Sequence, residues 1–263
     1  MDILLLNQYF NVPEGSPNEY YAILPLGLIC LASYLRCQNV TTKIEELGIH
    51  RNEKPLHFDD HIRFGKSDQE IIDLIKKHNP KYIGIGCMFS RHYNEVVEIA
   101  TLIKQHFNVK IIIGGSHASA NTINEPCFDY VVKGEGEVAL FHLLKTGEVI
   151  KHTTKNLDDF PIPDYDLVDT RAYLNDTFIS PFLMRPPSLG VVSSRGCPEN
   201  CIFCSVRNVW GRSWRGKSAQ RFVGELELYH NKYGVNEFAF LDDSISTDIN
   251  RFEDICNLIV KKN

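Results

Sequence analysis

The sequence predicts an α/β protein, because short apolar segments alternate with segments of helical periodicity along its first half. Each predicted strand is apolar throughout, which is typical of parallel strands that helices cover on both faces. Five such strands within residues 1–150 fit a doubly wound, flavodoxin-like (Rossmann-like) five-stranded parallel sheet. The predicted strands are residues 2–6, 43–47, 81–86, 109–113 and 130–133.

Helices are predicted between these strands, at residues 25–37, 67–79, 94–107 and 137–145. The second has the clearest boundaries. Ser67 is followed three residues later by Glu70, which is the pattern of a capping box, and Pro80 follows its last residue. Gly147 follows the last helix and is a typical helix-terminating residue.

The second half of the chain repeats the alternation of strand and helix after an irregular stretch. Residues 151–187 contain an acidic, proline-bearing segment and are interpreted as a linker. The strands predicted after it are residues 189–193 and 236–241, and the helices are residues 218–233 and 249–261. The expected organisation is therefore a domain at 1–150, the linker, and a second domain at 188–263.

Composition and charge narrow the function classes. The chain has 263 residues with 28 Lys+Arg and 33 Asp+Glu, a net charge of −5, which argues against nucleic acid as the main partner. The basic stretch at residues 207–221 is interpreted as a solvated loop or a contact to anionic cofactor groups, with RNA as the alternative. No apolar run is long enough to span a membrane and the N-terminus lacks a basic leader, so a cytoplasmic protein is expected.

Three of the eight cysteines form a motif, C-x3-C-x2-C, on a loop after a predicted strand. Cys197, Cys201 and Cys204 can face one point, and thiolates in such an arrangement hold iron–sulfur clusters. A zinc site needs a fourth ligand, and the nearest following histidine, His230, lies within a predicted helix. A redox pair of Cys201 and Cys204 leaves Cys197 unexplained. Other cysteines are interpreted as small hydrophobic residues, namely Cys30, Cys37 and Cys256.

Small, polar and glycine residues follow the predicted strands of the first domain. Parallel sheets of this type bind ligands outside the carboxyl ends of their strands, so these residues are candidates for one binding site. Taken singly, a Gly-Gly pair is commonly a tight turn and a lone histidine a hydrogen-bonded edge residue. No loop has the Gly-x-Gly-x-x-Gly pattern, which disfavours a nicotinamide site. The candidates are Asn7, Met88, Ser90, Gly114, Gly115, Ser116, His117, Gly134, Glu135 and Gly136.

The cysteine motif, with Phe203 before its last cysteine, resembles the signature of the radical S-adenosylmethionine (radical SAM) enzymes. Other segments resemble the subgroup of this family that carries an N-terminal cobalamin-binding domain. They are Ser193-Ser194-Arg195-Gly196-Cys197-Pro198, Pro25-Leu26-Gly27-Leu28, Gly114-Gly115-Ser116-His117-Ala118, Val131-Val132-Lys133-Gly134-Glu135-Gly136-Glu137, Asp158-Asp159-Phe160-Pro161 and Phe240-Leu241-Asp242-Asp243.

The resemblance implies three cofactors. Cys197, Cys201 and Cys204 would hold a [4Fe–4S] cluster whose open iron chelates S-adenosylmethionine. Phe203 would lie near the adenine. Asp242 and Asp243 would lie near the methionine amino group, the alternative being an N-cap of the last helix. Cobalamin would lie against the ten candidate residues of the first domain.

No histidine ligand to cobalamin is expected, because the Asp-x-His-x-x-Gly motif is absent after the first strand. Residues 59–65 contain an Asp, a His and a Gly, but the glycine is one residue late and the position in the chain is wrong.

The resemblance also implies a function. Radical SAM barrels contain more βα units than the two that can be read between Leu189 and Asn263, so an incomplete (βα) barrel is expected. The expected activity is cleavage of S-adenosylmethionine to a 5′-deoxyadenosyl radical, with cobalamin-dependent methyl transfer or related radical chemistry on a small-molecule or natural-product substrate. Expected partners are an electron donor such as flavodoxin or ferredoxin and a chain that supplies the missing barrel. The alternative is a non-catalytic cobalamin- or cluster-binding remnant.

Overall fold

The computed structural model describes residues 1–16, 23–49, 53–174 and 186–262. The chain forms two compact units, Met1–His152 and Thr153–Asn263. Within the described residues, no helix is long and apolar enough to cross a membrane.

A five-stranded parallel sheet forms the centre of the first unit, as predicted. Its strands run in the order β3-β1-β6-β7-β8, and every neighbouring pair is parallel. The strands are β1 (Ile3–Asn7), β3 (Thr42–Glu46), β6 (Tyr82–Gly86), β7 (Lys110–Gly114) and β8 (Tyr130–Val131). The carboxyl ends of all five strands therefore meet at one edge of the sheet.

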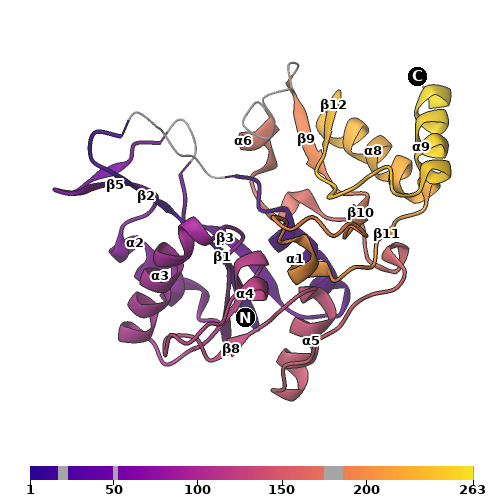
Figure 1. The fold of residues 1–263 in the computed structure, drawn as a ribbon. Helices are drawn as coiled ribbons and strands as arrows, with labels where there is room; N and C mark the ends of the chain where they lie inside the picture. Colours follow the sequence, from indigo (N-terminus) through magenta and orange to yellow (C-terminus); the bar gives the residue numbers. More distant parts are fainter. Residues whose placement is uncertain (17–22, 50–52, 175–185, 263) are drawn as a thin grey trace. The chain divides into compact units, whose positions relative to one another are not determined.

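Helices cover both faces of this sheet, with α2 and α3 on one side and α1 and α5 on the other (Figure 1). Their bounds are α1 (Leu26–Cys37), α2 (Asp68–His78), α3 (Tyr93–His106), α4 (Ser116–Ala120) and α5 (Gly136–Thr146). The capping box predicted for α2 is present: Ser67 accepts from the Glu70 N–H, and the Glu70 side chain accepts from the Ser67 N–H. Gly147 ends α5 in the left-handed conformation, also as predicted.

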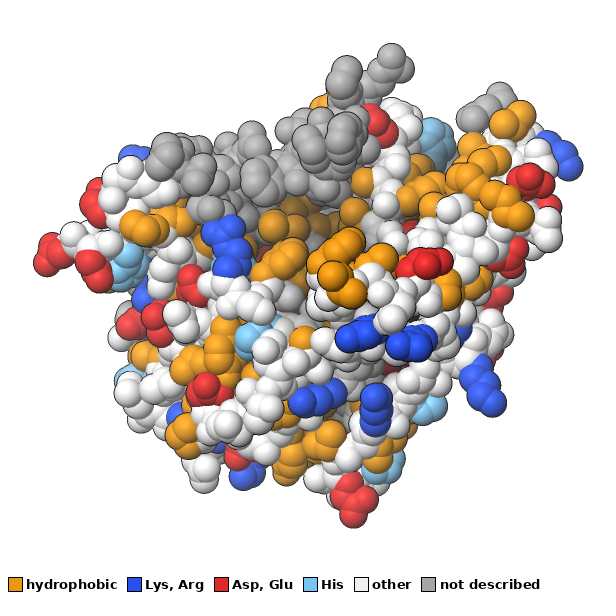
Figure 2. All heavy atoms as spheres, viewed as in Figure 1, with side chains coloured by type: hydrophobic (Ala, Val, Ile, Leu, Met, Phe, Trp, Pro, Cys, Tyr) orange, Lys and Arg blue, Asp and Glu red, His pale blue; other side chains and the backbone are white. Residues whose placement is uncertain are grey.

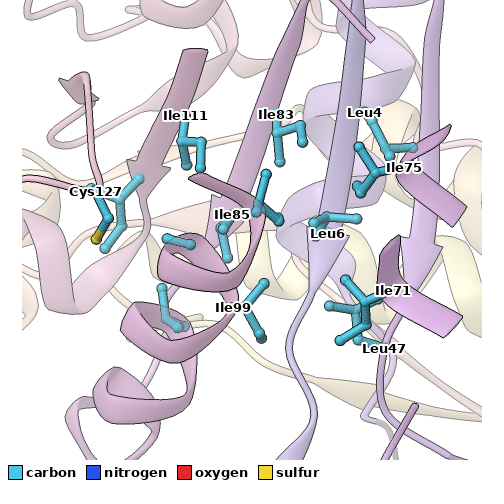
Figure 3. Close-up of a cluster of buried hydrophobic side chains, with 14 of the residues drawn as sticks. Leu4, Leu6, Leu47, Ile71, Ile75, Ile83, Ile85, Ile99, Ile111 and Cys127 are labelled. Carbon is cyan, nitrogen blue, oxygen red and sulfur yellow. The ribbon is translucent and has the colours of Figure 1, made fainter. Parts of the chain in front are cut away.

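The main core lies between the sheet and the helices α2 and α3 (Figure 3). Alternate residues of each strand point to this face, which is the period of an extended chain. The strand residues are Leu4, Leu6, Ile83, Ile85, Ile111 and Ile113, and they meet Ile71 and Ile75 of α2 and Val96, Ile99 and Ile103 of α3. The residues that alternate with them, Ile3, Leu5 and Ile112, are buried as well, so the apolar runs that predicted the strands are buried on both faces of the sheet.

The first unit also contains a small antiparallel sheet, which the hydrophobic pattern of the sequence does not predict. It consists of β2 (Phe10–Pro13), β4 (Leu56–His57) and β5 (His61–Phe64) in the order β2-β5-β4. Its strands are short and lie among charged residues, so their hydrophobic periodicity is weak. His61, within the Asp-His-Gly near match at 59–65, is on β5 and thus on a strand of this sheet.

The second unit contains one complete β-α-β repeat. Strands β9 (Ser188–Val191) and β12 (Glu237–Phe240) are parallel, and α8 (Ala219–Tyr233) connects them. A two-stranded antiparallel ribbon pairs β10 (Ser194–Arg195) with β11 (Arg215–Gly216). The remaining helices are η2 (Leu157–Asp159), η3 (Tyr165–Leu167), α6 (Thr170–Leu174), α7 (Val206–Trp210) and α9 (Ile249–Lys262).

Part of the stretch interpreted as a linker packs within this second unit. Tyr165 is almost fully buried, its hydroxyl donates to the Gly190 carbonyl at 2.8 Å, and its ring meets that of Tyr229 edge-on. The Tyr229 hydroxyl in turn donates to the Pro163 carbonyl at 3.0 Å. Residues 153–174 therefore belong to the second unit, and residues 175–185 lie outside the described residues.

Hydrophobic side chains remain exposed on the second unit. Val260 of α9 is 74% exposed, and Ile249, Leu241 and Leu228 are each more than two-fifths exposed. Exposed hydrophobic atoms over α9 are visible in Figure 2. Among the described strands, β12 pairs with β9 alone, so its second edge is unpaired.

Candidate functional site

Hydrogen bonds join the loop after β6 to the loop after β7 at the carboxyl edge of the first sheet. The Cys87 N–H donates to the Gly114 carbonyl at 2.8 Å, and the His117 N–H donates to the Cys87 carbonyl at 3.1 Å. Gly115 has φ of 102°, and a Cβ there would lie 2.6 Å from the Cys87 carbonyl oxygen. Only glycine allows this approach of the loop after β7 to the loop after β6. The contact brings Ser90 to His117, with 2.8 Å between Oγ and Nδ1.

The loop after β8 is hydrogen-bonded to α4, the short helix that follows β7. The Gly134 N–H donates to Ser119 Oγ at 2.9 Å, and Gly134 has φ of 77°. Gly136 begins α5, and a Cβ there would lie 2.7 Å from a methyl carbon of Leu31, so its lack of a side chain lets α5 pack against α1. Glu135 between them is buried.

The remaining predicted residues of the first unit have different surroundings. Asn7 is the last residue of β1, so it lies at the carboxyl edge of the sheet. The Met88 side chain is 57% exposed, and Ser116 is the first residue of α4. Hydrogen bonds thus link Ser90, Gly115, His117 and Gly134, and the other predicted residues lie at the same edge.

The cysteine loop begins after β10 in the second unit. None of the three thiols is in a disulfide; Cys197 and Cys204 are half-buried and Cys201 is exposed. Between Cys201 and Cys204 the chain makes a turn, closed by the Cys204 N–H donating to the Cys201 carbonyl at 3.1 Å. Within the described ranges, no three Cys, His, Asp or Glu side chains are grouped to hold a metal ion. Three free thiols on one exposed loop match the donor set of an iron–sulfur cluster.

The zinc alternative gains no support from His230. Its Nδ1 lies 2.9 Å from the Val235 carbonyl oxygen, in the last turn of α8. The redox-pair alternative still leaves Cys197 without a role.

The segment that precedes Cys197 is held by the two aspartates after β12. Asp242 accepts from the Ser193 N–H, from Ser193 Oγ at 2.7 Å and from Ser194 Oγ. Asp243 accepts from the Gly196 N–H at 3.2 Å. Ser193 and Ser194 are both buried, so these hydrogen bonds are made away from water.

The helix N-cap interpretation of the aspartate pair is wrong. The last helix, α9, begins at Ile249, and the Arg251 N–H in its first turn donates to Asp248 at 3.0 Å. Asp242 and Asp243 lie upstream of that turn and bind the approach to the cysteine loop instead. Burial raises the pKa of Asp243, and the neighbouring Asp242 adds to this effect.

A buried arginine supports the same segment from the other side. Arg251 donates to the Ser193 carbonyl at 2.9 Å and to the Lys217 carbonyl at 2.5 Å, and its guanidinium lies 5.5 Å from the centre of the Trp214 ring. The Lys217 N–H also donates to the Ser193 carbonyl, at 2.9 Å. Ser193 is thus bound through its N–H, its hydroxyl and its carbonyl.

The cysteine loop itself carries exposed side chains of two kinds. Phe203 is 88% exposed and Ile202 is 98% exposed, so both are available to contact a bound molecule. Arg207 and Arg212 both donate to the Asn200 side-chain carbonyl, at 2.9 and 3.2 Å. Two guanidinium groups therefore lie beside the loop that carries the thiols.

Comparison with known proteins identifies the first unit. Residues 20–144 match the family model of the B12 binding domain. The chain is 34% identical over 259 residues to an uncharacterized methyltransferase of Pyrococcus horikoshii, an alignment that covers 88% of this chain and 51% of that protein. The chain therefore contains a B12 binding domain and is similar over most of its length to a methyltransferase.

Two further relatives have lower sequence identity to this chain. Cytidylyl-2-hydroxyethylphosphonate methyltransferase of Streptomyces wedmorensis is 26% identical, with 88% of this chain and 53% of that protein covered. The anaerobic magnesium-protoporphyrin IX monomethyl ester cyclase of Synechocystis is 25% identical, with 75% and 43% covered. The chain therefore spans about half the length of the curated relatives it matches.

The fold is similar to that of a solved protein, the radical SAM methyltransferase TsrM of Kitasatospora setae. With tryptophan and a SAM analogue bound, that structure aligns with a TM-score of 0.70 at 16% identity, covering 99% of this chain and 51% of TsrM. The form with cobalamin and a [4Fe–4S] cluster bound has a TM-score of 0.68 at 15% identity, covering 100% and 51%. At 15–16% sequence identity, this structural similarity is evidence for the fold alone.

Two residues that position the predicted ones, Asn121 and Arg251, were not indicated by the sequence patterns. Asn121 follows the last residue of α4 and lies four positions after His117, a spacing that could have indicated their contact. No local pattern indicated Arg251, because its partner Ser193 is 58 residues away in the sequence.

Proposed function

We propose that this chain binds cobalamin on its first unit and a [4Fe–4S] cluster with S-adenosylmethionine on its second, as part of a radical SAM methyltransferase. The observation that carries the proposal is the loop of three free cysteines, which Asp242 and Asp243 anchor in a chain that also contains a B12 binding domain. The bound groups would supply one-electron cleavage of the sulfonium of S-adenosylmethionine and methyl transfer through cobalamin.

The residues of the second unit have separate tasks in this proposal. Cys197, Cys201 and Cys204 supply three thiolates and leave one iron open for the amino and carboxylate groups of S-adenosylmethionine. Phe203, whose side chain is largely exposed, covers the adenine. Asp243 is assigned to the methionine ammonium. Asp242 holds the loop through Ser193 and Ser194.

The first unit binds the corrin at the carboxyl edge of its sheet. In this proposal the backbone at residues 114, 115, 134 and 136 lines the site, while Asn7, Ser90, Ser116, His117 and Glu135 supply polar groups, and Met88 supplies apolar contact. No histidine ligand to cobalt is proposed. The proposed substrate is a small molecule or natural product, and the proposed electron donor is a flavodoxin or ferredoxin in the cytoplasm.

A second candidate function is a binding module that needs another polypeptide to complete its barrel. The unpaired edge of β12 among the described strands, together with the exposed Leu241 and Val260, favours this candidate. In that case the cofactors bind but turnover requires the additional barrel units.

Anaerobic reconstitution tests the cluster. The full chain is expected to hold close to four irons and four sulfides, with a spectral change when S-adenosylmethionine is added. Cys197→Ala, Cys201→Ala and Cys204→Ala are each expected to lose the cluster, whereas Cys256→Ala, at an exposed position of α9, retains it. A wild-type chain that stays folded but binds no iron would refute the proposal. An intact cluster without cleavage of S-adenosylmethionine favours the binding module.

A further inference from the structure

The imidazole of His117 is held by side chains from several elements at the carboxyl edge of the first sheet. Its Nδ1 lies 2.8 Å from Ser90 Oγ and 3.2 Å from Asn121 Nδ2. The ring of Tyr93 lies against it, with 4.3 Å between ring centres, and the Tyr93 hydroxyl donates to Glu125. The orientation of the ring and the environment of Nδ1 are therefore both restrained.

The hydrogen bonds define which nitrogen of His117 carries the proton. Asn121 Nδ2 lies 2.9 Å from the His117 main-chain carbonyl, which can only accept, so the amide orientation is determined. The same NH2 group therefore also donates to Nδ1. Nδ1 is an acceptor, the Ser90 hydroxyl donates to it as well, and the hydrogen of the neutral ring is on Nε2. Burial lowers the pKa of His117, in agreement with a neutral ring.

The Nε2–H is the group that remains for a ligand. None of the hydrogen bonds between described residues uses Nε2, and the side chain is half-buried at the edge where the loops after β6 and β7 meet. A nitrogen that carries hydrogen has no lone pair for a metal. The arrangement therefore suits an oxygen acceptor and disfavours a cobalt ligand.

We propose that His117 donates a hydrogen bond from Nε2–H to an oxygen at the periphery of bound cobalamin and does not coordinate cobalt. This inference rests on the proposed binding of cobalamin by the first unit. Cobalamin offers two kinds of oxygen acceptor, the amide carbonyls around the corrin and the phosphate of its nucleotide tail. Either oxygen accepts the same N–H.

Binding measurements with two corrinoids test the donor role. The full-length chain is titrated with hydroxocobalamin and with cobinamide, which keeps the corrin amides but lacks the phosphate. His117→Ala is expected to weaken hydroxocobalamin binding by about 2- to 12-fold, the range for one hydrogen bond. His117→Gln places an N–H near the position of Nε2 and is expected to restore part of the affinity. A loss that persists with cobinamide assigns the acceptor to the corrin amides, and one that disappears assigns it to the phosphate.

Spectroscopy tests the absence of a cobalt–histidine bond. The chain, uniformly labelled with ¹⁵N, is loaded with cob(II)alamin and examined by electron paramagnetic resonance. No superhyperfine splitting that changes with the ¹⁵N label is expected. A label-dependent splitting that is lost in His117→Ala would overturn the inference.

The control is His106→Ala. His106 ends α3 and its Nδ1 lies 2.9 Å from the Leu102 carbonyl oxygen, so it has a local role only. If His117→Ala binds both corrinoids as tightly as His106→Ala, the inference fails while the proposed function stands. If the folded wild-type chain binds neither corrinoid, both this inference and the proposed function fail.

Discussion

The anchoring of the cysteine loop by Asp242 can be tested with one conservative substitution. Asp242→Asn keeps the size of the side chain but leaves one acceptor oxygen and adds an NH2 group. Three donors point at the native carboxylate, namely the Ser193 N–H, Ser193 Oγ and Ser194 Oγ. Both hydroxyls donate to Oδ1 and the Ser193 N–H lies within reach of both oxygens, so at least one of these donors faces the new NH2 group whichever oxygen it replaces.

The size of the expected effect of Asp242→Asn follows from the strength of the hydrogen bonds to the carboxylate and from the burial of Ser193 and Ser194. A hydrogen bond to a charged group contributes about 1.5–3 kcal/mol. Ser193 and Ser194 are 0% and 2% exposed, so water does not replace the lost acceptor. Losing one such bond shifts the ratio of anchored to released loop by about 10- to 150-fold. We expect iron to leave the reconstituted variant faster by a factor in this range.

The assay is the rate at which an excess of chelator removes iron from anaerobically reconstituted protein. Ser194→Ala, which removes one donor and leaves the carboxylate, is expected to give an intermediate rate. Asp254→Asn, at an exposed position of α9, is the matched control and is expected to behave as wild type. Circular dichroism shows whether each variant is folded. Equal iron-release rates for Asp242→Asn, Asp254→Asn and wild type would refute the reasoning.

Three further predictions concern the first unit and are measured by urea unfolding. Ser67→Ala removes the capping box of α2 and should lower the unfolding free energy by about 1 kcal/mol; an unchanged value contradicts it. Gly115→Ala should lower the unfolding free energy by about 3 kcal/mol, because its φ of 102° is unfavourable for alanine and the Cβ would meet the Cys87 carbonyl. Gly147→Ala, whose Cβ would lie in open space, should lower it by about 1 kcal/mol. Equal losses for the two variants would contradict the steric argument. Burial lowers the pKa of His92 to about 4 from 6.5. The unfolded chain then binds more protons between these values, so stability is lost as pH falls from 6.5 towards 4, by up to about 1.4 kcal/mol per pH unit. His92→Phe should reduce this slope, and identical slopes for variant and wild type would contradict it.

The parallel sheet could be predicted because its information is local. Ile3–Leu6 and Ile111–Ile113 are unbroken apolar runs, and such runs are typical of strands buried on both faces. The capping box at Ser67 and the spacing of the cysteine motif are also patterns within a few residues. The small antiparallel sheet could not be predicted, since β4 and β5 have two and four residues and lie among charged side chains.

The sequence by itself therefore determined the fold class of the first unit, the order of its elements and the three-cysteine motif on which the proposed chemistry rests. Only the tertiary structure decided what the polar side chains contact. Asp242 binds Ser193 across 49 positions of sequence, and Ser90 binds His117 across 27. Periodicity and motif spacing report on neighbours along the chain, whereas these partners meet because the loops at strand ends converge when the strands pair.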